Sequence, residues 1–141
     1  MSKTTYEDYL AKNGTLIYRN IGTSMLPLLK QGRDLFIIKK KTQSRCKKYD
    51  VVLFKRADNK YVLHRIIKVN EYDYTIRGDN CVNKEYGVKD DDILGVMTSF
   101  IRKGKEYTVD NRLYKIYSVL WCRLYFLRRV YQKLSSKGVL K

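Results

Sequence analysis

The stretch Gly22-Thr23-Ser24-Met25-Leu26-Pro27 and the later stretch Val62-Leu63-His64-Arg65-Ile66 carry most of what the sequence says about fold and chemistry. The first places a hydroxyl in a turn that Pro27 stiffens, because proline fixes its own φ and restricts the residue before it. The second holds the only histidine of the chain, within an apolar run typical of a strand. A serine becomes a good nucleophile when a neighbouring imidazole takes its proton. The two stretches therefore predict a Ser24–His64 pair.

The residues around Ser24 suggest supporting roles. Gly22 allows the backbone to approach a substrate closely, and Met25 is expected to help anchor the turn in the core while Ser24 faces a cleft. A plainer interpretation stands beside this one. A lone histidine in an apolar strand is more often a core residue than a catalyst, and a serine beside a glycine is often only a turn residue.

Composition favours one folded, intracellular protein without a metal or other cofactor. The 141 residues and 44% hydrophobic content are enough for one core and exclude a disordered chain. The three cysteines, Cys46, Cys81 and Cys122, match neither a metal-ligand spacing nor a disulfide framework. Residues 1–8 are polar, unlike a secretory signal, and no apolar run is long enough to span a bilayer. We expect a cytoplasmic protein, or one peripheral at the inner face of the membrane.

The charge points to an anionic partner. Thirty basic residues against 14 acidic ones give a net charge of +16. Such an excess favours nucleic acid, an anionic membrane surface or an acidic peptide, and it does not choose among them. Solubility alone is the plain alternative.

The pattern of apolar and turn residues predicts a mainly β domain over residues 1–109, a compact barrel or folded sheet. A capping pattern at Thr4 and Glu7, with Gly14 beyond, predicts a short helix over 5–13. The expected strands are 15–19, 34–39, 50–55, 60–69, 73–77, 92–101 and 106–109.

Residues 110–141 predict a separate segment, a long basic amphipathic helix. Its apolar positions recur at intervals of three and four and share one face: Leu113, Tyr117, Leu120, Leu124, Leu127, Tyr131 and Leu134. The expected end of the helix is at 135–138. This face could cover the β domain, bind an anionic membrane surface through residues 113–134, or mediate self-association.

Five short boxes follow one another along the chain: Gly22-x-Ser24-Met25-x-Pro27, Gly32-x-Asp34, Tyr49-Asp50-Val51-Val52-Leu53-Phe54, Val62-Leu63-His64-Arg65-Ile66 and Arg77-Gly78-Asp79-Asn80. In this order they resemble the boxes of the signal peptidase and LexA-type serine peptidases. The resemblance covers residues 21–96, about half of the chain. Most members use a lysine base. The His-Arg box instead resembles the endoplasmic-reticulum and archaeal type of signal peptidase, which uses Ser, His and an acid.

The resemblance implies Ser24 as nucleophile and His64 as general base, with Asp79 or Glu85 as the acid. We favour Asp79, which lies within the Gly-Asp-Asn box. Some bacterial members have an oxyanion-stabilising serine where this chain has Gly22. The oxyanion would then rest on the Ser24 N–H, helped by Thr23 or a nearby loop amide.

The expected function is a serine endopeptidase that cleaves a leader or signal-like peptide, after small residues. Two alternatives remain open. One is a small basic barrel that binds nucleic acid, since the chain interleaves 13 tyrosines with its basic residues. The other is an inactive protein of the same fold that binds leader peptides without cutting them.

Overall fold

The computed structural model describes residues 5–136, apart from the side chains at positions 126, 128, 132, 135 and 136. The elements are α1 (Tyr6–Asn13), β1 (Thr15–Arg19), β2 (Leu35–Lys40), β3 (Val51–Lys55), β4 (Tyr61–Val69), β5 (Tyr74–Arg77), β6 (Glu85–Val88), the 3-10 helix η1 (Asp90–Asp92), β7 (Ile93–Arg102), β8 (Lys105–Thr108), α2 (Arg112–Arg123) and α3 (Tyr125–Ser136). The chain divides into two compact units, Met1–Val109 and Asp110–Lys141. A mainly β protein with short helices is thereby confirmed. Within residues 5–136, no helix is long and apolar enough to cross a membrane.

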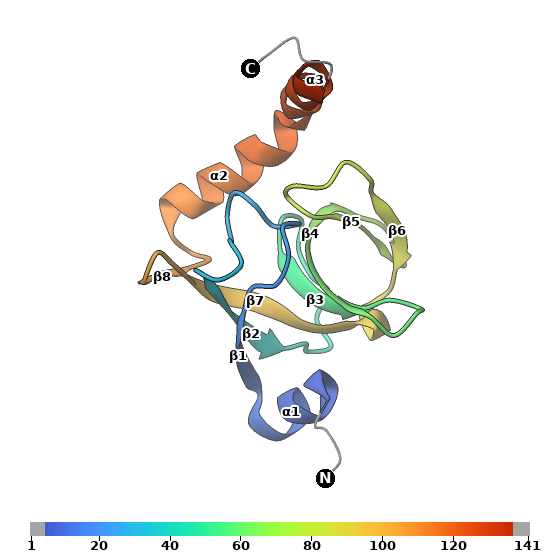
Figure 1. Ribbon diagram of the computed structural model, residues 1–141. Coiled ribbons are helices and arrows are strands. Elements are labelled where there is room, and N and C mark those ends of the chain that lie inside the picture. The colour runs from blue at the N-terminus through green and yellow to red at the C-terminus, as the bar shows by residue number, and fades with distance from the viewer. Residues whose placement is uncertain (1–4, 137–141) are drawn as a thin grey trace. The chain divides into compact units, whose positions relative to one another are not determined.

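The strands of the first unit form one antiparallel sheet in the order β1-β2-β7-β3-β4-β5-β6, with β8 paired to β7 beside this path. The sheet is open, and β1 and β6 are its two ends. It is therefore a folded sheet and not a closed barrel. Figure 1 shows how strongly the half from β3 to β6 curves.

The centre of the sheet is buried almost continuously. The first four residues of β3 are buried, as their apolar sequence requires, and all four residues of β5 are buried although Thr75 and Arg77 are polar. Val52, Ile66 and Ile76, on three successive strands, are fully enclosed in one cluster. This packing gives β4, the strand that carries His64, a rigid support on both sides.

Helix α1 begins one residue later than the capping pattern suggests. Thr5 is the N-cap, and its Oγ1 accepts a hydrogen bond from the Asp8 N–H at 3.1 Å. Gly14 ends the helix with a φ of 76°, a left-handed conformation that glycine adopts at little cost. Thr4, expected to cap the helix, lies outside the described residues.

The single long helix predicted near the C-terminus is wrong. The structure has two helices, α2 and α3, and Leu124 between them has φ −94° and ψ 14°. The Leu127 N–H donates to the Leu124 carbonyl, three residues back, at 3.0 Å. This tighter turn interrupts the α-helical pattern without any glycine or proline to signal it. The expected helix end at 135–138 lies partly outside the described residues.

Strand β6 was not predicted either. It has only four residues, and Gly87 within it has a φ of +73°. Glycine weakens a strand, so neither the length nor the composition of this segment indicates one.

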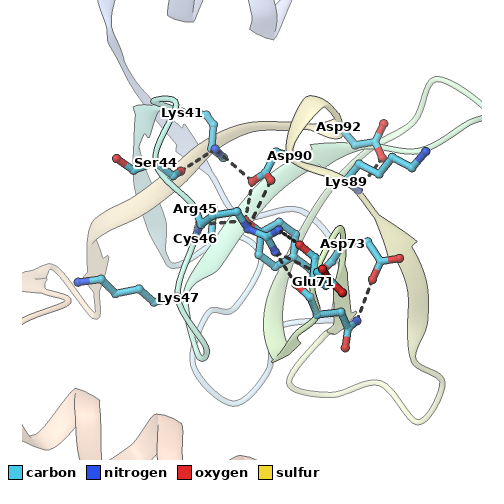
Figure 2. A network of polar contacts seen from close by, with 12 residues as sticks. Lys41, Ser44, Arg45, Cys46, Lys47, Glu71, Asp73, Lys89, Asp90 and Asp92 are labelled. Atoms are coloured by element: carbon cyan, nitrogen blue, oxygen red, sulfur yellow. Dashed lines mark hydrogen bonds and ion pairs between the residues drawn. The ribbon is translucent and has the colours of Figure 1, made fainter.

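A polar network joins the connection between β2 and β3 to the β4–β5 turn, to β5 and to η1 (Figure 2). Arg45 lies 4.4 Å above the Tyr74 ring and donates to the Glu71 carbonyl at 2.8 Å. Asp90 accepts a hydrogen bond from the Tyr74 hydroxyl and lies 3.3 Å from the Lys41 amine. Burial and the Asp90 contact raise the pKa of Tyr74 to about 12. The Tyr74 hydroxyl therefore stays protonated, and the network stabilises the position of the β2–β3 connection.

Candidate functional site

Ser24 lies in the loop between β1 and β2, which buried polar residues hold in one conformation. The Asn20 N–H donates to the Asp34 carbonyl at 3.0 Å, and Asn20 Nδ2 donates to the Leu29 carbonyl at 3.1 Å. The Asp34 carboxylate in turn accepts the Lys103 N–H at 3.0 Å, which ties the loop to the end of β7. Because these groups are inside the protein, their hydrogen bonds fix the loop firmly.

The residues expected to help Ser24 have more structural roles than predicted. Gly22 has a φ of 81°, a left-handed conformation that favours glycine. No atom lies within 4 Å of where its Cβ would be, so the backbone conformation, and not lack of space, requires glycine here. Its N–H donates to Gln31 Oε1 at 2.6 Å, so this N–H does not face a substrate. The Met25 side chain is only 1% exposed and anchors the loop in the core. Thr23 and Pro27 are exposed.

The Ser24 loop and the His64 ring meet beside Gly78. A Cβ on Gly78 would lie 2.7 Å from the Ser24 carbonyl oxygen and 2.9 Å from His64 Cδ2. The following turn holds the loop, because the Asn80 N–H donates to the Ser24 carbonyl at 2.8 Å and Asn80 Nδ2 to the Thr23 carbonyl at 3.0 Å. The fold therefore brings together the two stretches that the sequence singled out. Within residues 5–136, no hydrogen bond joins the Ser24 hydroxyl to His64.

Cys81 lies where these two segments meet, a position that no sequence pattern indicated. Its Sγ is 4.0 Å from His64 Nε2 and 4.0 Å from the Ser24 carbonyl oxygen. Burial raises the pKa of the Cys81 thiol above its ordinary value. At neutral pH the sulfur is therefore a protonated thiol and a weak nucleophile.

The two candidate acids have different partners. Glu85 Oε1 lies 3.7 Å from His64 Nδ1, a contact too long for a hydrogen bond but close enough for charge attraction. Arg56 Nε holds Glu85 from the other side, at 3.1 and 3.2 Å from its two oxygens. Asp79 instead forms a two-bond ion pair with Arg65, at 2.8 and 3.0 Å. The geometry thus favours Glu85, and not Asp79, as the group that faces the imidazole.

His64 is held as a neutral base. It is 5% exposed, and its Nδ1 has no hydrogen-bond partner among the described residues. Burial lowers the pKa of His64 to about 4; Glu85 opposes this shift, while Arg56 adds to it. At neutral pH the ring is uncharged and can accept a proton.

A groove of about 1100 Å³ lies beside Glu85. Arg56, Glu85, Tyr86 and Gly87 line one part of it, between the β3–β4 hairpin and strand β6. Strand β6 pairs only with β5, so its outer edge is unpaired within the described residues. Tyr86 on this strand is 74% exposed. The groove therefore offers an extended chain both room and a free strand edge.

Comparisons with family models, curated proteins and solved structures found no match to this chain.

Proposed function

We propose that this chain is a serine peptidase of the signal peptidase type, with Ser24 as nucleophile, His64 as general base and Glu85 as the acid that orients the base. One observation carries the proposal: the Ser24 loop and the His64 ring converge on Gly78. Glu85 lies on the Nδ1 side of the ring, while Nε2 lies 4.0 Å from Cys81 Sγ, which is itself 4.0 Å from the Ser24 carbonyl oxygen. This is the order in which nucleophile, base and orienting acid act in such enzymes.

The reaction is an acyl transfer. Rotation of the Ser24 side chain brings its hydroxyl towards His64 Nε2, a contact that often tightens only when substrate binds. Nε2 takes the proton as Oγ attacks the peptide carbonyl carbon. The tetrahedral intermediate then collapses, and the imidazolium gives its proton to the leaving amine. Water, activated by the same nitrogen, attacks the acyl-enzyme and releases Ser24.

The oxyanion is stabilised by few donors. The Gly22 N–H is already bound by Gln31, so the Ser24 N–H is the donor that the loop offers. Loss of one such donor costs on the order of 3 kcal/mol of transition-state stabilisation. We expect a slow enzyme, suited to processing a dedicated substrate.

The groove beside β6 suits an extended peptide. A peptide that adds to the free edge of β6 would satisfy its own backbone hydrogen bonds there, and the groove would receive alternate side chains. The family resemblance adds a preference for small residues before the cut. The proposed substrate is a leader or signal-like peptide.

The test compares cleavage of a peptide library by the parent protein, Ser24→Ala and His64→Ala, with products identified by mass spectrometry. Ser44→Ala is a matched control, because Ser44 is an exposed serine of the β2–β3 connection. Cys81→Ala separates this mechanism from one in which the thiol beside His64 attacks. We expect cleavage by the parent, Ser44→Ala and Cys81→Ala, and none by the other two.

Two results would contradict the proposal. Cleavage that persists in Ser24→Ala but disappears in Cys81→Ala would make the thiol the nucleophile. Tight binding of leader peptides without cleavage by the parent would indicate an inactive protein of the same fold.

A further inference from the structure

Helices α2 and α3 carry a line of exposed apolar side chains, which we call the apolar stripe. Its members are spaced by three or four residues: Leu113, Ile116, Leu120, Leu124, Leu127 and Tyr131. This spacing puts the members within each helix on one face, and Leu120, Leu124 and Leu127 line one hollow where the two helices join. Each is between 47% and 76% exposed. A contiguous apolar surface of this kind marks an interaction site.

The apolar stripe is not the buried face of α2. Tyr114 and Ser118 are the buried residues of α2, with exposed fractions of 8% and 3%. They are four residues apart and lie on a different side of the helix from Leu113 and Leu120. Helix α2 therefore has a buried face and, separately, an exposed apolar one.

Aromatic residues border the middle of the stripe. Tyr117 and Trp121 stack with their ring centroids 5.8 Å apart. With Leu120, Leu124 and Leu127 they line a shallow hollow of about 420 Å³. Tyrosine and tryptophan are favoured where an apolar layer meets water, because each ring carries a polar atom.

The charge around the stripe has one sign. Asp110 is the last acidic residue of the chain, and every charged side chain after it is basic. Arg112 is one turn from Ile116, and Arg123 is one turn from both Leu120 and Leu127, so these arginines border the stripe. Both are exposed. The long arginine stems can cover apolar surface while the guanidinium groups reach outward.

We propose that the apolar stripe binds the surface of a membrane that contains anionic phospholipid. The leucines enter the boundary between headgroups and acyl chains, and the flanking arginines pair with lipid phosphates. This binding is a second activity of the chain, independent of whether Ser24 is catalytic.

The other occupants fit less well. A second copy of the chain would bring two sets of basic side chains together without an acidic residue from this segment between them. A nucleic acid would contact cations, but it offers nothing to bury the leucines between them. An anionic membrane surface matches both the apolar stripe and its basic border.

The test is sedimentation of the full-length protein with vesicles. One set is pure phosphatidylcholine and the other replaces about a quarter of it with phosphatidylglycerol. The variant Leu120→Ser/Leu127→Ser removes part of the stripe, and Arg112→Gln/Arg123→Gln removes only its charge. The control Ile17→Ser/Ile21→Ser changes two residues of the first unit that are 59% and 60% exposed. Far-ultraviolet circular dichroism verifies that each variant is folded.

We expect partition to the anionic vesicles about tenfold or more above that to phosphatidylcholine, and a loss on the order of tenfold in each helix variant. Added salt should weaken binding to the anionic vesicles, and the control variant should bind like the parent. Equal partition by the parent and both helix variants would overturn the proposal. Absence of binding to anionic vesicles would also overturn the proposal. If the leucine variant then dissociated a dimer, the occupant would be a second copy of the chain; if the arginine variant released RNA, it would be a nucleic acid.

Discussion

Arg65 binds Asp79 through two buried hydrogen bonds, from Nε to Oδ1 at 2.8 Å and from Nη2 to Oδ2 at 3.0 Å. Neither side chain is more than 1% exposed. Arg65 also donates to the Tyr49 carbonyl at 2.9 Å, which joins the start of β3 to the turn after β5. The Gly-Asp-Asn box therefore holds the fold together at the point where it presents Gly78 to the Ser24 loop.

Removal of either partner of this pair should destabilise the protein strongly. We expect Asp79→Asn and Arg65→Met each to lower the free energy of unfolding by about 3–5 kcal/mol, because each leaves an unbalanced buried group. The double variant should lose less than the sum of the two. Urea unfolding of the four proteins measures this. Single variants within about 0.5 kcal/mol of the parent would contradict a structural role for the pair.

Changes at Glu85 and Arg56 should move the acid limb of the pH–rate profile in opposite directions. Glu85 favours the charged form of His64 and Arg56 opposes it. Glu85→Gln should therefore lower the pKa of His64 further, while Arg56→Gln should raise it. The acid limb of kcat/KM, near pH 4 in the parent, should shift accordingly.

The Glu85 variant should also lose rate, by about 100-fold or more, because the imidazole loses the group that orients it. Asp58→Asn is the control, since it removes an exposed carboxylate from the same hairpin as Arg56. Profiles that do not move in either variant would show that Glu85 does not act on His64.

Gly78→Ala should separate the two halves of the site. The added methyl would lie 2.7 Å from the Ser24 carbonyl oxygen, 2.8 Å from Cys81 Sγ and 2.9 Å from the His64 ring, so the site must shift to admit it. A shift of this size costs about 100-fold in rate when nucleophile and base must align. Steady-state cleavage measures the rate, and thermal unfolding reports the state of the fold. A folded variant with the activity of the parent would contradict the proposed site.

Burial of neutral His64 should make the protein sensitive to acid. Its pKa is about 4 when folded and 6.5 ordinarily, so between these values the unfolded chain binds a proton that the folded one does not. Stability is therefore complete above 6.5 and falls as the pH falls towards 4. The loss near pH 5 should be on the order of 2 kcal/mol. In urea unfolding, His64→Gln should lose less stability than the parent between pH 7.5 and 5; an equal loss would contradict this account.

The sequence predicted those parts of the fold that local patterns determine. Alternating and apolar runs gave the strands within a residue or two, and Gly14 marked the end of α1 correctly. Strand β6 was missed because it forms through pairing with β5, and because Gly87 within it is a residue that disfavours strands. The break at Leu124 was missed because no residue there signals a stop.

Sequence patterns singled out the candidate residues of the site, but not all of the contacts that these residues make. The boxes pointed to Ser24 and His64, and the fold brings their segments together. Asp79 was favoured as the acid because it stands in a recognisable box. The contact between Asp79 and Arg65 depends on the antiparallel pairing of β4 with β5, which no local pattern reports. The approach of Cys81 to His64 is likewise a tertiary contact.

The most direct test is covalent labelling of the full-length protein with a fluorophosphonate, followed by peptide mapping with mass spectrometry. This reagent reports whether a neighbouring base activates a hydroxyl. We predict one adduct, on Ser24, formed at least about 100-fold more slowly in His64→Gln, which lacks that base. A folded parent protein that gains no adduct at Ser24, or gains it equally fast without the imidazole, would contradict the account.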